Sequence, residues 1–355
     1  MENLLLRKKT SMEKEIHQQP LILSKILKSF LTDNNEIKLD VPENIKKIVL
    51  VASGSSYHCA RYGADLFGQV ADMEARAIYS SEFLLKPKVP SDEGLLYIFI
   101  TQSGETSDTL RAAKRAKQLN MPIMCITNKE YSSIWEISDY KVDCHAGEEK
   151  SIAATKSFTA QMLCVYLLTL KFAQKHGVDV SERLKIVRTL PDVVEETFEF
   201  RKKVVQLAKL LKRKKNIVIT ADGISYALAK EASLKIKETS YLNINANILG
   251  EFMHGHVAVL NNSCSLIYIS ASGVSYTAMK NLTKIKNDYN PPIYIIGRSH
   301  ENIVPNLNIT IDNDDATMRM FSNAVIIQML ALEMALLLGR NVDKPKGLHK
   351  VVKEN

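Results

Sequence analysis

The sequence predicts an α/β protein made of two copies of one domain, each a mainly parallel, doubly wound sheet covered by helices on both faces. One observation is that short apolar strands alternate with helical patterns, the order typical of such sheets. A second is that landmarks recur at one fixed offset along the chain. The length of 355 residues also exceeds that of one ordinary domain.

Four pairs of landmarks carry the repeat. The apolar strand and Gly/Ser turn of Ile48–Tyr57 return as Ile217–Tyr226, so that Gly54 and Gly223 are 169 residues apart (223 − 54). The same offset relates three further pairs: Glu82 and Glu251, Ser103-Gly104 and Ser272-Gly273, and Pro122 and Pro291. A fixed offset of this kind indicates an internal duplication.

Local hydrophobic patterns predict the following helices and strands. Ser11–Phe30 has helical periodicity and predicts an arm, and the charged stretch Pro191–Leu211 predicts a helix that connects the copies. In the first copy, the strands Leu95–Ile100 and Ile123–Ile126 flank a helix over Ser107–Leu119. We expect four parts: a helical arm (1–35), a first domain (36–195), a second domain (196–340) and a tail (341–355).

Composition excludes several classes of protein. Hydrophobic residues make up 46% and charged residues 24%, which is typical of a globular protein. Apolar runs such as Met162–Leu170 are shorter than the roughly 20 residues that a bilayer requires, and Glu333 interrupts Ile326–Leu338. The first nine residues reverse the order of a signal peptide. We therefore expect no membrane segment and a cytoplasmic protein.

Charge and cysteine content point to a small anionic substrate. The formal charge is +8, but basic residues are mixed with 39 acidic ones and no zinc-finger spacing occurs, so we expect no nucleic-acid partner. The five cysteines form no Cys-x-x-Cys pair, which argues against a disulfide scaffold and a thiolate zinc site. A positive protein attracts anionic substrates equally well.

One loop has the composition of an anion site. Thr101–Thr109 follows a strand and opens a helix, so its backbone N–H groups and the helix dipole favour a phosphate. Ser55 and Ser56, at the turn after the preceding strand, are expected beside it. No nucleotide-binding glycine motif occurs. Ordinary helix capping by serine and threonine is the alternative. A third such loop is Ser151–Phe158, in which Lys156 is by default a solvated lysine.

The second copy carries candidate acid–base residues. Glu231, Lys235 and Glu238 share one helical face, and a carboxylate on a partly apolar face suits a general base. An exposed Glu231–Lys235 salt bridge with Glu238 as a bystander is the alternative. His254 lies in a glycine-flanked loop, where an imidazole can act in catalysis. Glu251, His254 and His256 lack a fourth ligand, so we expect neither a metal nor a cofactor.

Together these motifs resemble the double sugar-isomerase (SIS) domain family, in particular the isomerase half of glutamine-fructose-6-phosphate aminotransferase and the SIS-type glucosamine-6-phosphate deaminases. The resemblance covers nearly the whole chain. It runs from Met12–Pro20 through the motifs above to the tail around Lys350. It implies two tandem SIS domains of three-layer αβα type and a phosphorylated sugar as the ligand.

The resemblance also implies roles for single residues. Glu238 matches the base that moves a proton between carbons 1 and 2, Lys235 assists the intermediate, and Lys350 reaches the open-chain sugar. His254 matches the ring-opening group that a neighbouring subunit donates, which implies a homodimer with shared active sites. The remaining implied contacts to the sugar or its phosphate are Ser55, Ser56, Thr101, Gln102, Ser103, Thr106, Ile152, Ala153 and Lys156.

Two departures from the family matter. Gly255-His256 replaces the usual Gly-Pro after the histidine, which leaves the choice between His254 and His256 open. No N-terminal cysteine nucleophile occurs, so we expect no glutaminase activity. The expected reaction is then conversion of glucosamine 6-phosphate to fructose 6-phosphate and ammonia. The alternatives are a deglycase that cleaves phosphorylated fructosamines, and a non-catalytic phosphosugar sensor.

Overall fold

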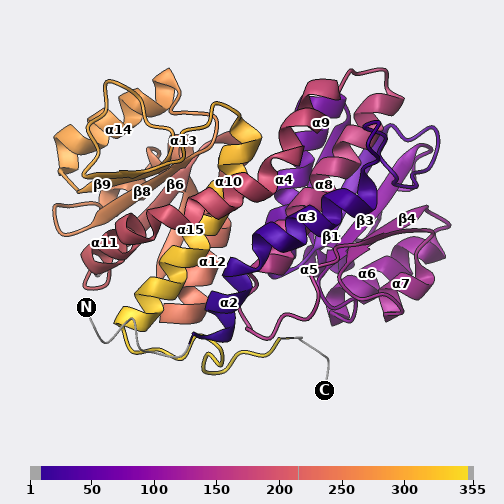
Figure 1. The fold of residues 1–355 in the computed structure, drawn as a ribbon, viewed down its shortest axis with the longest axis horizontal. Helices are drawn as coiled ribbons and strands as arrows, with labels where there is room; N and C mark the ends of the chain where they lie inside the picture. The colour runs from indigo at the N-terminus through magenta and orange to yellow at the C-terminus, as the bar shows by residue number, and fades with distance from the viewer. Residues whose placement is uncertain (1–8, 215, 351–355) are drawn as a thin grey trace.

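The chain forms two five-stranded sheets in which all strands are parallel (Figure 1). The structure is a computed structural model that describes residues 9–214 and 216–350. The first sheet has the order β2-β1-β3-β4-β5, with β1 Lys47–Ala52, β2 Glu74–Tyr79, β3 Leu95–Thr101, β4 Ile123–Thr127 and β5 Tyr140–Asp143. The second has the order β10-β9-β8-β6-β7, with β6 Ile217–Ala221, β7 Ile244–Ile248, β8 Ser265–Ser270, β9 Ile293–Gly297 and β10 Leu307–Ile309. Because the two orders are equivalent strand by strand, the predicted fold class is confirmed.

Helices connect the strands of each sheet. In the first copy they are α4 Gly54–Ala71, α5 Ser80–Leu85, α6 Ser107–Gln118, α7 Ser133–Ile137 and α8 Lys156–Lys175. In the second they are η2 Gly223–Ser225, α12 Tyr226–Ser240, α13 Leu249–Phe252, η3 His256–Val259, α14 Tyr276–Tyr289 and α15 Ala316–Leu337. The arm contains α2 Ser11–His17 and α3 Gln19–Phe30, and the copies are joined through α9 Ser181–Arg188, α10 Leu190–Thr197, η1 Phe198–Phe200 and α11 Arg201–Leu211.

Two stretches that the sequence predicts as single helices are interrupted. The arm breaks at Gln18 because Pro20 has no N–H to continue the ladder, and Gln19 Nε2 instead donates to the free carbonyl of Ile16 at 2.9 Å. The connecting segment bends at the 3₁₀ turn Phe198–Phe200. The proline therefore changes the direction of the arm, and the 3₁₀ turn changes the direction of the connecting segment.

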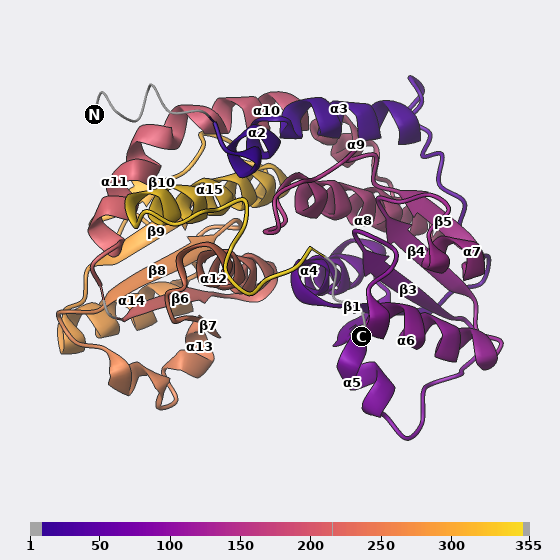
Figure 2. The same cartoon turned by 90° about the horizontal axis from the view of Figure 1, so that it is seen from below.

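The core has three layers in each copy, and the two copies share the middle of the molecule (Figure 2). Helices α4 and α8 cover one face of the first sheet, α12 and α15 cover one face of the second, and α4 packs against α12. Separate apolar clusters lie under α5–α7 and under α13–α14. The copies are therefore joined through one continuous core.

Helix α15 is long and apolar enough to cross a membrane by length and composition, and it is the one such helix among residues 9–214 and 216–350. Its most apolar window has a mean hydropathy of 1.7, and 89% of that window is buried inside the fold.

The strand ends set the position of the polar turns. All seven residues of β3 are buried, as expected for a central parallel strand covered on both faces. Its carboxyl end and that of β1, its neighbour, lead into the turns before α6 and α4. Gly54 opens α4 with φ +57°, and Gly223 occupies the equivalent place with φ +53°. The turns of the first copy therefore converge at one edge of the first sheet.

Candidate active site

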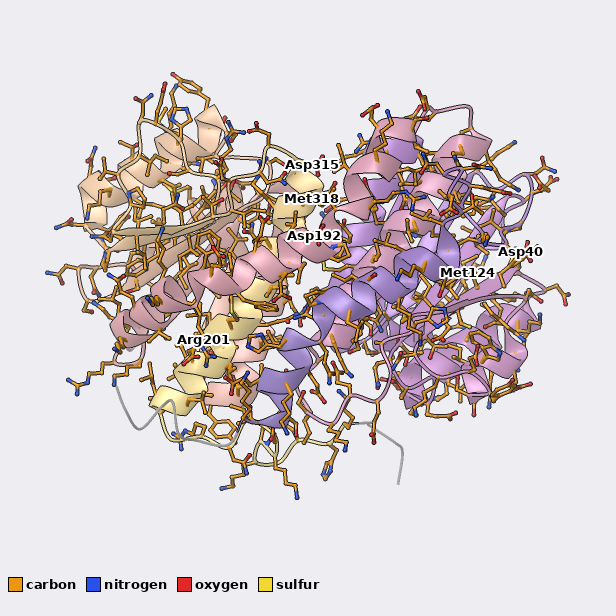
Figure 3. The ribbon with its side chains drawn as sticks, viewed as in Figure 1. Asp40, Met124, Asp192, Arg201, Asp315 and Met318 are labelled. Carbon is orange, nitrogen blue, oxygen red and sulfur yellow. The ribbon has the colours of Figure 1, made fainter. Side chains whose placement is uncertain are left out.

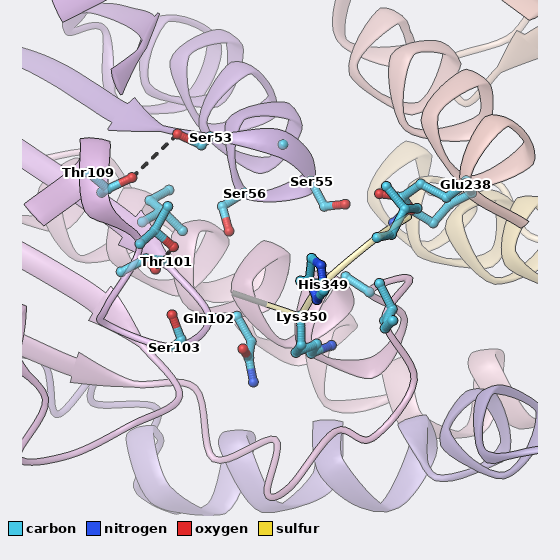
Figure 4. Close-up of a pocket in the computed structure, with 17 residues that line it drawn as sticks. Ser53, Ser55, Ser56, Thr101, Gln102, Ser103, Thr109, Glu238, His349 and Lys350 are labelled. Atoms are coloured by element: carbon cyan, nitrogen blue, oxygen red, sulfur yellow. Dashed lines mark hydrogen bonds and ion pairs between the residues drawn. The ribbon is translucent and has the colours of Figure 1, made fainter. Parts of the chain in front are cut away.

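A cavity of about 270 Å³ lies at this edge, between the first sheet, helix α12 of the second copy and the C-terminal tail (Figure 4). It is lined by three segments of the first copy and two of the second half of the chain. The lining residues are Ser53, Gly54, Ser55, Ser56, Ile100, Thr101, Gln102, Ser103, Thr106, Thr109, Ile152, Ala154, Lys235, Glu238, Leu348, His349 and Lys350. Most of the residues predicted for the site thus lie in one cavity.

Hydroxyl groups form one end of the cavity. The Thr101 and Thr106 hydroxyls lie 3.1 Å apart, and the Thr109 hydroxyl lies 2.9 Å from that of Ser80 and 3.5 Å from that of Ser53. Helices α4 and α6 both begin here. Free N–H groups at two helix starts and several hydroxyls suit a phosphate dianion.

Protein contacts hold this loop in one conformation. Gly104 has φ +71°, and a Cβ placed there would lie 2.0 Å from Ser132 Oγ, so glycine is required. The Glu105 carboxylate accepts hydrogen bonds from Ser133 N at 2.7 Å and Ser133 Oγ at 2.8 Å. The loop is therefore shaped in advance, which lowers the entropic cost of binding an anion.

Removing two hydroxyls should weaken substrate binding strongly. Each charge-assisted hydrogen bond contributes about 1.5–3 kcal/mol, so Ser103→Ala with Thr106→Ala should raise Kd for a sugar phosphate by roughly 10²-fold or more. Isothermal titration calorimetry measures this directly.

The matched control is Ser272→Ala in the second copy, where the equivalent loop is occupied by protein groups. There Ala271 N donates to Ser225 Oγ at 3.0 Å, and the Ala271 carbonyl accepts a hydrogen bond from the Arg319 guanidinium. This variant should bind as wild type does. Equal affinity of the double variant and wild type would show that the first loop does not bind the phosphate.

A buried row of charges forms the opposite end of the cavity. On α12, Lys235 Nζ lies 2.5 Å from Glu238 Oε2 and 3.6 Å from Glu231 Oε1. Lys235 and Glu231 are fully buried, whereas the Glu238 side chain is 21% exposed and reaches the cavity. The exposed salt bridge considered as an alternative is therefore not present. Glu231 Oε2 also lies 2.6 Å from Nδ1 of His58, on α4 of the first copy.

Mutual pairing favours the charged forms of Glu231 and Lys235 despite their burial. Burial alone would raise the pKa of Glu231, but Lys235 and then His58 outweigh it and hold the pKa below its ordinary value. Burial would lower the pKa of Lys235, and Glu238 and Glu231 outweigh it, so the pKa is raised. The raised pKa favours the cationic form of Lys235 beside Glu238, the one carboxylate among the described residues that line the cavity.

The third loop, Ser151–Phe158, contributes two of its residues to the cavity wall. Ile152 and Ala154 line the cavity, whereas Ala153 and Lys156, also predicted to contact substrate, do not. Ala153 is fully buried, and Lys156 Nζ donates to Gln18 Oε1 of the arm at 2.9 Å. Glu15 of α2 holds the start of this loop through hydrogen bonds from Ser151 and Lys150 N. The arm therefore supports the cavity wall.

The C-terminal tail forms part of the cavity wall through Leu348, His349 and Lys350 (Figure 4). Lys350 Nζ lies 2.5 Å from Glu149 Oε2 and donates to the Ser151 carbonyl at 2.7 Å. Burial alone would raise the pKa of Glu149, but Lys350 and donors from Ser157 and Thr155 outweigh it and hold the pKa below its ordinary value. Lys350 thus fastens the tail to the third loop.

This ion pair predicts acid lability. Because the pKa of Glu149 is lowered on folding, the pair contributes stability above the unfolded-state value of about 4.3 and loses it as the pH falls through the folded-state value. Denaturant midpoints at pH 6 and pH 3 should show a smaller acid-induced loss for Glu149→Gln than for wild type. Parallel losses in both proteins would contradict a depressed pKa at Glu149.

His254 lies outside this cavity in its own chain. It follows α13, its backbone N–H donates to the Glu251 carbonyl at 3.0 Å, and the residue is exposed; His256 begins η3. Across the described residues, no group of three or more His, Cys, Asp or Glu side chains is placed to hold a metal ion.

Sequence reasoning missed several residues of the site. Thr109 ends the predicted loop and Ser53 precedes the predicted Ser55–Ser56 turn, but neither was among the predicted contacts, although the hydroxyl of each could have suggested a role. His349 lies next to the predicted Lys350, yet only the path of the tail puts it in the cavity wall. Glu149 contacts Lys350, which is 201 positions away in the chain, and His58 contacts Glu231, which is 173 positions away. No local sequence pattern predicts contacts over such separations. Figure 3 draws the described side chains as sticks on the ribbon of both copies.

Fold and cavity define a protein of two sugar-isomerase-type α/β domains. The sequence matches the SIS domain family at residues 43–171 and again at 210–338, and the chain belongs to this family. It is 30% identical over 346 residues to glutamine-fructose-6-phosphate aminotransferase (isomerizing) of Campylobacter jejuni, and 33% identical over 349 residues to that of Thermococcus kodakarensis. These alignments cover 96% of this chain but only 58% and 57% of the relatives, so the chain spans less than two thirds of their length.

Solved structures share the fold over nearly the whole chain. The C-terminal domain of glucosamine-fructose-6-phosphate aminotransferase from Francisella tularensis superposes with a TM-score of 0.89 at 24% identity, covering 95% of this chain and 99% of that one. Glucosamine-6-phosphate deaminase from Thermotoga maritima superposes with a TM-score of 0.77 at 23% identity, covering 97% and 99%. At these identities the likeness shows the fold.

Proposed function

We propose that the protein is a phosphosugar isomerase-type enzyme that converts glucosamine 6-phosphate to fructose 6-phosphate and ammonia. The observation that carries the proposal is that a hydroxyl-lined anion loop of the first copy and the Lys235–Glu238 pair of the second face one cavity. Isomerisation of a hexose 6-phosphate requires a group that binds the phosphate on carbon 6 and an acid–base group near carbons 1 and 2. Membership of the SIS family supports this class of reaction.

The cavity suggests a division of roles. The Thr101–Thr109 loop binds the phosphate and fixes the direction of the sugar chain. Glu238 takes the proton from carbon 2 and returns it to carbon 1, and Lys235 stabilises the negative charge that develops on the intermediate. Lys350, on the part of the cavity wall formed by the tail, binds the hydroxyl groups of the open-chain sugar.

The groups that face the cavity support acid–base chemistry on the sugar itself. The five cysteines are all buried, and none of them lines this cavity. The described cavity thus offers no thiol nucleophile for an amide. What it offers is acid–base chemistry on a phosphorylated amino sugar.

The alternative is a deglycase that releases an amino acid from a phosphorylated fructosamine. It needs the same phosphate loop and the same base. Leu348 and His349 line the cavity and are exposed, so the cavity wall formed by the tail is in contact with solvent, where a larger amine substituent could extend. Substrate choice therefore separates the two readings.

The test measures amine release from both kinds of substrate. Coupled assays would follow ammonia from glucosamine 6-phosphate and free amino acid from a fructosamine 6-phosphate. We expect ammonia release with the higher kcat/KM. Faster release of the amino acid would replace the proposal with the deglycase, and binding of both without turnover would leave a sensor.

We further propose that the enzyme is a homodimer in which His254 completes the partner's site. His254 is exposed and does not line its own chain's cavity, which fits a group donated to a neighbour. Mixing Glu238→Gln and His254→Ala subunits should then restore about a quarter of wild-type activity, because half the dimers are mixed and each has one intact site. Fully active monomers at assay concentration, or no recovery on mixing, would contradict sharing.

A further inference from the structure

The wall of the cavity contains a histidine that the proposed reaction does not yet use. His349 lines the cavity next to Lys350, and Figure 4 shows both side chains on the tail, across from Glu238. His349 is exposed, so its ring is accessible to water. Imidazole is the side chain best suited to accept and donate protons near neutral pH.

The other ionisable groups that line the cavity are already paired. Glu238 is bound to Lys235 at 2.5 Å, and Lys350 is bound to Glu149 at 2.5 Å. His349, in contrast, makes no hydrogen bond or ion pair with any residue in 9–214 or 216–350. Its ring is therefore available to a bound substrate.

Contacts on either side of His349 fix the path of the tail. Asp343 accepts hydrogen bonds from Ser11 N at 2.8 Å and Met12 N at 3.0 Å, at the start of α2. Lys346 N donates to the Tyr241 hydroxyl at 2.7 Å, directly after α12 ends. With Lys350 also fastened, the backbone on both sides of His349 is held against the cavity.

We propose that His349 is a catalytic residue for the release of the amine, an inference that rests on the proposed function. Once Glu238 has returned its proton to carbon 1, the nitrogen remains as an iminium at carbon 2. A water oxygen bonds to carbon 2 and loses a proton to the imidazole, which passes it to the nitrogen. The C–N bond then breaks with its electron pair going to nitrogen. The hydroxyl proton on carbon 2 joins the ammonia, leaving a carbonyl and ammonium.

The neighbouring groups are poorly suited to this step. Lys350 Nζ is already bound to the buried Glu149 carboxylate and to the Ser151 carbonyl, so it is not free to assist an attacking water. Glu238 already transfers the proton between carbons 2 and 1, and it is paired with Lys235. An unpaired imidazole at a water-accessible wall supplies the missing acid–base group.

The experiment separates the amine step from the carbon-proton step. We compare His349→Ala with wild type in ammonia release from glucosamine 6-phosphate and in deuterium uptake at carbon 1 of fructose 6-phosphate in D₂O, which involves no amine. Ammonia release should fall roughly 10²-fold, deuterium uptake should not change, and added imidazole should restore the lost release. His176→Ala, at an exposed histidine after α8 and outside the cavity, is the matched control and should behave as wild type.

Each outcome decides the inference. Equal losses in both assays would mean that His349 only supports the tail, and no loss in ammonia release would mean that it has no role; either overturns the inference. If wild type releases an amino acid from a fructosamine 6-phosphate instead of ammonia, the proposed substrate fails, and the same comparison with that substrate still tests His349. If wild type takes up deuterium but releases no amine from either substrate, both proposals fall.

Discussion

Replacing Glu238 with glutamine should lower kcat by roughly 10²- to 10⁴-fold, the loss typical of a missing general base. Glutamine keeps the shape and reach of the side chain but cannot accept a proton. Because the phosphate loop is untouched, KM should change little. Steady-state kinetics of ammonia release from glucosamine 6-phosphate measures both parameters.

Glu196→Gln provides the control for this change. Glu196 is an exposed carboxylate on α10 and does not line the cavity, so its loss of charge should leave kcat unchanged. If Glu238→Gln keeps near-wild-type kcat, the proton carrier is another group, and the role given to Glu238 must be abandoned.

Replacing Lys235 with methionine should produce the largest loss of stability. The side chain is 1% exposed and lies between two carboxylates, of which Glu231 is completely buried. Removing one partner of a buried ion pair leaves uncompensated charge, at a cost of about 3–5 kcal/mol. The midpoint of denaturant unfolding should fall accordingly, even though methionine fills a similar volume.

Lys284→Met is the matched control for stability. Lys284 pairs with Asp288 at 2.6 Å in an i,i+4 arrangement on α14, but its side chain is 65% exposed. Exposed pairs of this kind contribute about 0–1 kcal/mol, so the midpoint should barely move. A small effect at Lys235, comparable with that at Lys284, would contradict a buried and charged lysine.

The sequence was sufficient for the features that follow local pattern. Leu95–Ile100 is a continuous apolar run that predicts most of β3, and the 169-residue offset places Gly54 and Gly223 at equivalent helix starts. Parallel strands put their following turns at one edge, so the grouping of Ser56 with Thr101 could be anticipated.

Long-range packing determines the side-chain contacts and the path of the tail, which local sequence pattern does not predict. In the third loop, Lys156 turns toward Gln18 of the arm because the arm packs there, and no period within the loop predicts it. The contact of His58 with Glu231 joins the two copies. The tail has no regular structure around His349, so its path depends on Asp343, Tyr241 and Glu149.

The central claim is that one carboxylate from the second copy moves a carbon-bound proton in a sugar held by the first. Its most direct test is the turnover of glucosamine 6-phosphate in D₂O, with NMR analysis of carbon 1 in the fructose 6-phosphate product. Glu238 is partly exposed to the open cavity, so its proton should exchange with solvent during turnover. We expect deuterium at carbon 1 with wild type and no product labelling with Glu238→Gln. Protium alone at carbon 1, the result of a direct hydride shift between the two carbons, would contradict the account.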